Sequence, residues 1–207
     1  MKNICCIVNP VSGLKKSLKV YYEAKNLFEK SYFNTSLFVS EYPNHIKNYV
    51  SKIEKNSFDR IIVFGGDGSI NEVVNGLNDS NNLQSFKLGV IPTGSGNSVA
   101  HDTGLLDVKD AISKSLGDNI IKMDLNQVDF DSVSRLSVSV LGWGMFSYGN
   151  IRAEKLRLLG PIRYDVASII TLLEKKIHKA EVEEDGKLKL LECAFIVACN
   201  SKHTGKG

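Results

Sequence analysis

The sequence predicts an α/β fold with a doubly wound parallel sheet, followed by the incomplete start of a β-rich second domain. Short apolar runs typical of buried strands alternate with segments of helical periodicity through the first part of the chain. Two glycine-rich turns each follow a predicted strand. After residue 123 this alternation stops and antiparallel signals replace it. We therefore predict one α/β domain over residues 1–123 and part of a β-rich domain over residues 124–207.

The strands of the first domain are predicted from short apolar runs bounded by turns. The first run reads ICCIV and the third reads RIIVF, and each ends at residues that favour loops. Runs that are apolar at every position are typical of parallel strands, because such strands are covered on both faces. In chain order, we predict strands at 4–8, 35–39, 60–64 and 88–91.

The helices between them are predicted from apolar residues that recur every three or four positions. In chain order, we predict helices at 16–30, 45–55, 70–77 and 108–115, with a short or interrupted helix that begins at Ser98. Helical connections between consecutive strands require those strands to be parallel. Ligands of such sheets bind at the carboxyl ends of the strands.

The last third of the chain has a different pattern. Residues 136–141 alternate serine with apolar residues, as a half-solvated strand does, and residues 164–179 carry one apolar helical stripe. A hairpin that turns at Asp185-Gly186 precedes an apolar strand at 191–199. Since these few strands cannot close a sandwich, we expect this domain to be incomplete.

Composition excludes several classes of protein. The 207 residues carry a net charge of only +3, so we expect no nucleic-acid binding. No apolar run approaches the roughly 20 residues of a membrane span, and the apolar N-terminus ends too early for a signal peptide. The four cysteines form no CxxC pair. They indicate reduced, buried thiols in a cytoplasmic protein rather than a redox or metal site.

Two glycine loops at the ends of predicted strands carry the chemistry. They read Gly65-Gly66-Asp67-Gly68 and Thr93-Gly94-Ser95-Gly96-Asn97, and Asn9-Pro10 begins a third loop. Backbone N–H groups in such turns bind phosphate. A carboxylate among them repels phosphate unless it binds metal or accepts a proton, so Asp67 favours phosphoryl transfer. The alternatives are a plain tight turn and an Asp67 that only caps the following helix.

These residues resemble a known family. Asn9-Pro10, residues 65–77 and residues 92–97 are similar to the diacylglycerol-kinase catalytic domain of lipid kinases. Residues 154–165 resemble the segment after the domain junction of sphingosine and ceramide kinases, and residues 202–207 resemble a strand-end motif of their second domain. The resemblance spans nearly the whole chain. It implies a phosphofructokinase- or NAD-kinase-like first domain and an ATP-dependent lipid kinase that uses Mg²⁺.

The resemblance also implies a role for individual residues. The acid that matches Asp67 takes the proton from the lipid hydroxyl. Residues 40–45 resemble a nucleotide-contacting segment of sphingosine kinases. No protein ligand to a metal is implied. The implied cofactor-binding residues are Asn9, Pro10, Ser40, Asn44, Gly65, Gly66, Gly68, Glu72, Gly94, Ser95 and Gly96, with Arg157 and Arg163 reaching the phosphates.

The lipid is expected to be a sphingoid base or ceramide. Sphingosine kinases hold the sphingosine amine with an acid in the segment that matches residues 146–153, and this stretch carries no acid. A neutral lipid such as ceramide or diacylglycerol is therefore expected to compete. The family's late Asp-Gly motif does not occur within the 207 residues, which predicts a fragment.

Other functions stay open at this point. The alternatives are a diacylglycerol kinase, an NAD kinase relative and a non-catalytic nucleotide-binding module. As a lipid kinase, the protein would be cytoplasmic and would associate transiently with membrane surfaces as a peripheral protein.

Overall fold

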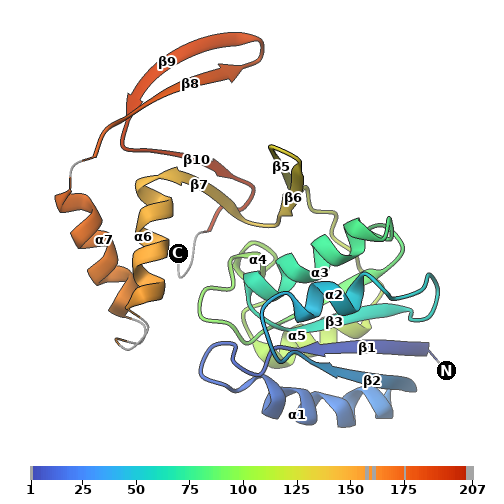
Figure 1. Ribbon diagram of the computed structural model, residues 1–207. Helices are drawn as coiled ribbons and strands as arrows, with labels where there is room; N and C mark the ends of the chain where they lie inside the picture. Colours follow the sequence, from blue (N-terminus) through green and yellow to red (C-terminus); the bar gives the residue numbers. More distant parts are fainter. Residues whose placement is uncertain (1, 157–158, 160–161, 175, 204–207) are drawn as a thin grey trace. The chain divides into compact units, whose positions relative to one another are not determined.

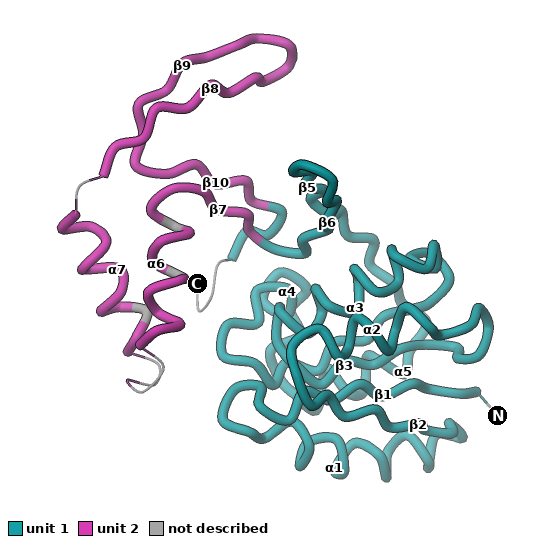
Figure 2. Tube along the Cα trace, viewed as in Figure 1, with its two compact units in different colours: residues 1–139, 200–207 teal, residues 140–199 magenta. Residues whose placement is uncertain are grey.

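The computed structural model describes residues 2–156, 159, 162–174 and 176–203 (Figure 1). The chain divides into two compact units, Met1–Ser139 with Asn200–Gly207 and Val140–Cys199 (Figure 2). Each unit is described below by itself. The predicted boundary at residue 123 separates domains that fold independently, whereas the two units are defined by compactness alone. The boundary therefore stays a prediction.

A four-stranded parallel sheet forms the centre of the first unit, in the order β2-β1-β3-β4. Its strands are β1 (Lys2–Val8), β2 (Phe33–Val39), β3 (Arg60–Gly65) and β4 (Lys87–Pro92). The predicted doubly wound α/β fold is therefore confirmed. From β1 the chain moves outward to β2 and then crosses back to β3 and β4. The winding reverses between β1 and β3, and this switch point is where sheets of this kind bind their ligands.

Helices cover both faces of the sheet (Figure 1). Successive residues of β1 alternate between the faces, since side chains alternate along a strand. Cys5 and Ile7 pack in the core cluster that α2 and α3 complete, whereas Ile4 and Cys6 pack in the cluster of α1 and α5. The helices of this unit are α1 (Ser17–Lys30), α2 (His45–Val50), α3 (Asp67–Asp79), α4 (Ser98–Asp102) and α5 (Val108–Leu116).

Two helix boundaries differ from the prediction. Helix α2 ends at Val50 rather than at residue 55, because the N–H groups of Lys52 and Ile53 bond to carbonyls three residues earlier, as in turns. Helix α3 begins at Asp67, three residues before the predicted start. Gly66 precedes it in an extended conformation. Asp67 is thus the first residue of a helix rather than part of a free loop.

The predicted strand at 136–141 is wrong. Strand β6 (Val133–Ser137) ends inside this range and pairs with β5 (Asn126–Phe130) as an antiparallel hairpin, while β7 (Val140–Gly144) belongs to the second unit. Residues between β6 and β7 lie in neither strand, and Val138 there is fully buried in the core of the first unit. Because Val138 is buried, the chain bends between the two strands. The alternation of serine with apolar residues does not reveal this bend.

The second unit contains helices as well as strands. Helix α6 (Met145–Lys155) was not predicted, and α7 (Arg163–Leu173) is shorter than the predicted helix at 164–179. The predicted hairpin is confirmed by β8 (His178–Glu184) and β9 (Lys187–Cys193), with Asp185 and Gly186 both at positive φ between them. The predicted strand at 191–199 is split, because Ala194 separates β9 from β10 (Phe195–Cys199), which pairs with β7.

The four thiols are expected to react at different rates. Burial raises the pKa of Cys5 to about 11, in spite of a hydrogen bond with Tyr49 that lowers it, and burial also raises the pKa of Cys6. At pH 8 only about one Cys5 thiol in a thousand is ionised, and the thiolate is the reactive form. Cys199 is exposed. We expect a thiol reagent at pH 8 to modify Cys199 in the folded chain and Cys5 and Cys6 only after unfolding, as mass spectrometry of labelled peptides can measure.

Candidate functional site

Asn9 lies at the switch point of the sheet, directly after β1. Its backbone N–H donates to the Phe64 carbonyl of β3 at 3.1 Å. Its side-chain amide donates to Ser69 Oγ at 3.0 Å and accepts from the Val11 N–H at 3.2 Å. Asn9 therefore joins the loop after β1 to the first turn of α3. Pro10, next to it, is partly exposed in the same loop.

The loop after β4 contacts both other loops. The Thr93 N–H donates to the Gly65 carbonyl at 3.1 Å, and Ser17 Oγ donates to Thr93 Oγ1 at 2.8 Å. A Cβ atom on Gly94 would lie 2.5 Å from Gly66 Cα. On Gly13, which has a φ of +54°, it would lie 2.3 Å from the Thr93 carbonyl oxygen. The structure thus brings together the three predicted loops. It adds Gly13, whose need for a positive φ and close approach the sequence did not reveal.

The remaining glycine-loop residues differ in exposure. Gly65 is buried, Gly66 is partly exposed, and Gly68 is exposed on the first turn of α3. In the loop after β4, Ser95 is exposed and Gly96 is partly exposed. The predicted loop residues therefore include surface groups at the carboxyl edge of the sheet, where a ligand can approach their backbone.

The Asp67 carboxylate is held by helix α4. Its Oδ2 accepts from the Ser98 N–H at 2.9 Å and its Oδ1 accepts from the Val99 N–H at 3.1 Å. The N-cap residue of α4, Asn97, makes no side-chain cap of its own. Asp67 thus supplies the capping acceptor that this short helix lacks. Asp67 does cap a helix, as the alternative interpretation expects, but the capped helix is α4 rather than the helix that Asp67 begins.

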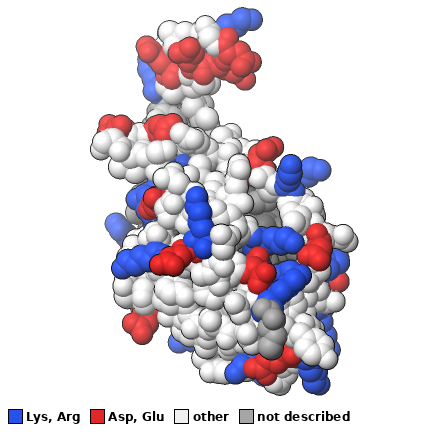
Figure 3. All heavy atoms as spheres, turned by 90° about the vertical axis from the view of Figure 1, so that its right-hand side faces the viewer, with Lys and Arg blue, Asp and Glu red and all other residues white. Residues whose placement is uncertain are grey.

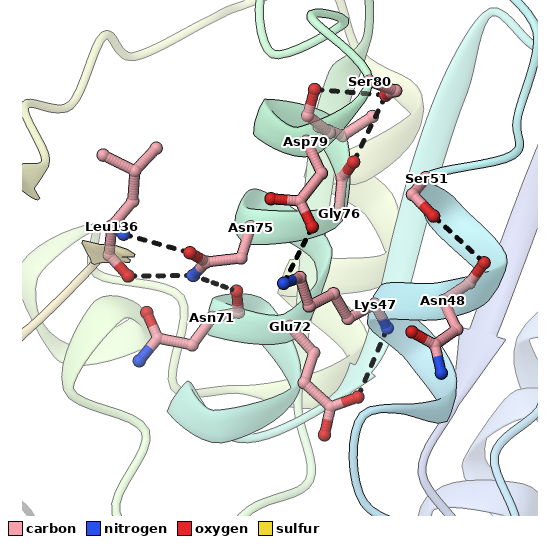
Figure 4. Close-up of polar contacts among 11 residues, drawn as sticks. Lys47, Asn48, Ser51, Asn71, Glu72, Asn75, Gly76, Asp79, Ser80 and Leu136 are labelled. Carbon is pink, nitrogen blue, oxygen red and sulfur yellow. Dashed lines mark hydrogen bonds and ion pairs between the residues drawn. The ribbon is translucent and has the colours of Figure 1, made fainter. Parts of the chain in front are cut away.

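Glu72 holds helix α2 in a similar way. Its Oε2 accepts from the backbone N–H of Ile46 at 3.1 Å and from that of Lys47 at 3.3 Å, and Figure 4 shows the second bond. The N-cap residue Asn44 has a φ of 65° and makes no side-chain cap. Ser40 is buried just before this segment, and its N–H donates to the Val8 carbonyl at 2.9 Å. Three predicted nucleotide contacts therefore lie around the start of α2, and their contact with nucleotide stays a prediction.

Replacement of Glu72 by alanine is expected to destabilise the protein. The substitution leaves two helix N–H groups without their acceptor, and loss of a capping acceptor costs about 1 kcal/mol. Urea denaturation measures the change in the free energy of unfolding. Glu23→Ala on the exposed surface of α1 is a suitable control, because its i,i+4 ion pair with Lys19 contributes little. Equal stability of the two variants would show that Glu72 does not stabilise α2.

Two asparagines of α3, Asn71 and Asn75, hold the end of β6 and the residue that follows the strand. The Asn75 amide donates to the Leu136 carbonyl at 2.8 Å and accepts from the Leu136 N–H at 3.0 Å (Figure 4). Asn71 Oδ1 accepts from the Val138 N–H at 3.0 Å. The two side chains satisfy backbone groups as a neighbouring strand would. Sequence reasoning missed them, although two asparagines at i,i+4 within an apolar helix could have indicated a buried polar contact.

Two arginines, Arg157 and Arg163, are predicted to contact the nucleotide phosphates. Arg163 is the first residue of α7, and its Nη2 lies 3.5 Å from Glu154 Oε1. Arg157 lies outside the described residues. Their predicted contact with nucleotide phosphates therefore stays untested.

Charged side chains of both signs lie on the face drawn in Figure 3. Acidic groups gather at the top, over hairpin β8–β9, which carries Glu181, Glu183, Glu184 and Asp185. Elsewhere on the drawn face, lysine and arginine side chains alternate with acidic ones. This mixed face agrees with the low net charge of +3. In the part of the chain that the structure describes, no helix has the length and apolar composition to cross a membrane.

The parallel sheet, with three loops meeting at its switch point, defines a doubly wound α/β protein, a class that binds its ligands at this edge. Residues 3–128 match the diacylglycerol kinase catalytic domain, and the chain belongs to that family. This result confirms the resemblance inferred from the sequence. Because the match covers the glycine loops and the sheet, it concerns the part of the chain that carries Asp67.

The chain is similar to proteins named as ceramide, sphingosine and diacylglycerol kinases. Human ceramide kinase is 31% identical over 202 residues, which is 87% of this chain and 37% of that protein. Sphingosine kinase 1 of Arabidopsis thaliana is 29% identical, with 80% of this chain and 36% of that protein covered. A crystal structure of a diacylglycerol kinase from Bacillus anthracis has a TM-score of 0.72 at 21% identity, and covers 98% of this chain and 65% of that one. The chain thus spans little more than a third of the two curated relatives.

Proposed function

We propose that the protein is an ATP-dependent lipid kinase that transfers the γ-phosphate of ATP to a lipid hydroxyl. The observation that carries the proposal is the placement of Asp67, whose carboxylate is fixed at the glycine loops by two N–H donors. Each carboxylate oxygen has a second lone pair, which remains available for a proton from the hydroxyl. Membership in the lipid kinase family supports the reaction class.

The loops would bind the nucleotide. Phosphoryl transfer depends on positioning and charge stabilisation rather than on covalent chemistry by the protein. We assign the phosphates to the backbone of the loops after β1, β3 and β4, and the rest of the nucleotide to Ser40 and Asn44 near the start of α2. Arg157 and Arg163 would neutralise phosphate charge. This division gives each predicted cofactor-binding residue a part in orienting ATP against Asp67.

Mg²⁺ would accompany the ATP phosphates. Within the described residues there is no group of three or more His, Cys, Asp or Glu side chains that could hold an ion. Mg²⁺ needs few protein ligands, since it keeps several waters and binds phosphate oxygens. We assign no side chain as its ligand, because Asp67 is the proposed base and both of its oxygens already accept N–H groups. Held by the phosphates, the ion would screen the charge that Asp67 otherwise repels.

The lipid would be a sphingoid base or ceramide, and two acids of the second unit that pair with arginines, Glu154 and Glu174, favour a neutral headgroup. Arg152 of α6 donates to Thr171 Oγ1 at 3.0 Å and forms an ion pair with Glu174. Its hydrogen bond holds the pKa of the Glu174 carboxyl below its ordinary value. Glu154 is paired with Arg163. An ammonium group would have to displace an arginine from one of these acids, whereas ceramide or diacylglycerol would not.

A screen with radiolabelled ATP tests the proposal. Sphingosine, ceramide and diacylglycerol are offered separately in mixed micelles, with Asp67→Asn as the blank. We expect incorporation of label into one or more lipids, with ceramide or diacylglycerol competing well against sphingosine. A strong preference for sphingosine would contradict the neutral-headgroup argument. ATP binding without transfer to any lipid would favour the alternative, a non-catalytic nucleotide-binding module.

Contact with a membrane surface would bring the enzyme to its lipid. Helix α7 exposes the apolar side chains of Ile169, Leu172 and Leu173. Exposed apolar side chains on one helix partition into the interface of a bilayer. Sedimentation with lipid vesicles measures this association. We expect Leu172→Glu to weaken it, and Leu14→Glu, at an exposed leucine of the first unit, to leave it unchanged. Equal binding of both variants would exclude α7.

A further inference from the structure

Residues 200–203 return to the first unit after strand β10. Asn200 fixes this segment, because its N–H donates to the Ser139 carbonyl at 3.0 Å and its side chain donates to the Asp124 carbonyl at 2.6 Å. Ser201 is buried, and its hydroxyl donates to the His203 carbonyl at 2.9 Å. The segment is therefore held against the first unit by both backbone and side-chain bonds.

The last residue of helix α4, Asp102, is bound by this segment through both carboxylate oxygens. Its Oδ1 lies 2.5 Å from His203 Nδ1, and its Oδ2 accepts from the Lys202 N–H at 3.0 Å. Although burial by itself raises the pKa of the Asp102 carboxyl, the hydrogen bonds from His203 and Lys202 hold it below its ordinary value. The carboxylate is thus ionised at neutral pH, and the contact joins residues 101 positions apart.

His101, also on α4, packs on the same histidine. The rings of His101 and His203 stack with centroids 5.2 Å apart and an interplanar angle of 28°. The side chain of His203 keeps 42% of its surface exposed, against 18% for Asp102. Among the residues that the structure describes, the Asp102 carboxylate and the His101 ring contact the His203 ring. A partly exposed pair such as Asp102 and His203 contributes little to global stability. Loss of this contact is therefore expected to affect α4 locally and to leave the unit folded.

Helix α4 connects this contact to Asp67. The helix has only five residues, Ser98–Asp102, so its length is about 7.5 Å. At its first residues, the N–H groups of Ser98 and Val99 bind the two oxygens of the Asp67 carboxylate. At its last residue, Asp102 is bound by His203. A helix this short moves as one body, so a change at Asp102 alters the donors that orient Asp67.

We infer that His203 is a positioning residue for Asp67, because it holds α4 through Asp102 and α4 holds the Asp67 carboxylate. The segment that follows β10 thereby fixes the orientation of the carboxylate at the glycine loops. The coupling itself is independent of the reaction, whereas its effect on catalysis rests on the proposed lipid kinase function.

Hydrogen exchange of single amides, measured by NMR on the 207-residue chain, tests the coupling without activity. In His203→Ala the Ser98 and Val99 amides are expected to exchange about tenfold faster, because local opening of α4 becomes easier. His203→Asn keeps an N–H donor at the position of Nδ1 and is expected to restore most of the protection. Lys202→Ala is the matched control, since Asp102 is bound by the Lys202 backbone rather than by its side chain.

Turnover provides the second measurement. If the lipid kinase function holds, His203→Ala is expected to lower kcat about tenfold, with the KM for ATP unchanged, because a misplaced base affects the transfer step rather than nucleotide binding. Wild-type exchange behaviour at Ser98 and Val99 in His203→Ala would overturn the inference. Faster exchange of β1 and β3 amides by the same factor would also overturn it, since His203 would then stabilise the whole unit. Faster exchange confined to α4, in a protein that phosphorylates no lipid, would support the coupling and reject the kinase function.

Discussion

Asp67→Asn is expected to lower phosphoryl transfer to lipid by about 100- to 10,000-fold, the range that positioned acid–base catalysis contributes. Asparagine cannot accept the proton of the hydroxyl. Its amide also keeps only one acceptor oxygen, so one of the Ser98 and Val99 N–H groups faces an NH₂ group instead. Initial rates with radiolabelled ATP measure the loss of transfer. Isothermal titration measures ATP binding, which is expected to persist.

The matched control for this variant is Asp79→Asn. Asp79 is the last residue of the same helix, and its carboxylate pairs with Lys47 Nζ at 2.7 Å rather than with the loops. This variant makes the same chemical change on α3 and is expected to keep most of the transfer rate. Near-normal turnover of Asp67→Asn would remove Asp67 from the mechanism. Loss of ATP binding together with turnover would assign Asp67 a structural role in shaping the loops.

Gly94→Ala is expected to separate the two glycine loops. A Cβ atom there would lie 2.5 Å from Gly66 Cα and 2.7 Å from Asn97 Oδ1, and the Gly66 contact is with backbone that cannot rotate away. Overpacking of this kind costs about 2 kcal/mol. Because the loops after β3 and β4 would move apart, we also expect ATP to bind more weakly. Urea denaturation and isothermal titration measure the two effects.

Gly68→Ala is the control for the stability measurement. A Cβ atom on Gly68 would meet nothing within 4 Å, and the residue lies in the first turn of α3. Alanine is expected to leave the free energy of unfolding unchanged or to raise it by up to about 1 kcal/mol, because alanine favours helix. If Gly94→Ala were as stable as Gly68→Ala, the close approach of the two loops would be wrong.

The sheet and its loops could be predicted from the sequence because their signals are local. A strand buried on both faces must be apolar at every position, as residues 61–64 are, and a phosphate loop at its end must be rich in glycine. The strand order could not be obtained in this way. The crossing from β2 back to β3 is set by which helices cover which face, and no single segment encodes it.

The capping contacts of the acidic residues could not be predicted, and their roles toward nucleotide and lipid stay predictions. Asp67 and Glu72 both carry carboxylates near expected phosphate or nucleotide contacts, yet each caps a helix that is distant in sequence. Capping of a helix by its own N-cap residue can be recognised from local sequence, whereas capping by another helix cannot. The hydrogen bonds between Asn75 and Leu136 could not be predicted for the same reason, since they join residues 61 positions apart.

The segment between β6 and β7 and helix α6 show where periodicity misleads. Serine and apolar residues alternate across 136–141, yet β6 ends at Ser137 and β7 begins at Val140. The break follows from the full burial of Val138 and from its N–H bond to Asn71. Helix α6 has few apolar positions in a regular stripe, so its pattern predicted no helix.

The sequence by itself determined the α/β class, the glycine loops at the ends of the strands and the family, because these depend on local residue types and spacing. Only the tertiary structure decided which groups hold the Asp67 carboxylate and how residues 200–203 reach α4. These contacts join residues 31 and 101 positions apart. Their partners are backbone N–H groups or single side chains, which every sequence contains in abundance, so only the folded chain selects the ones that meet.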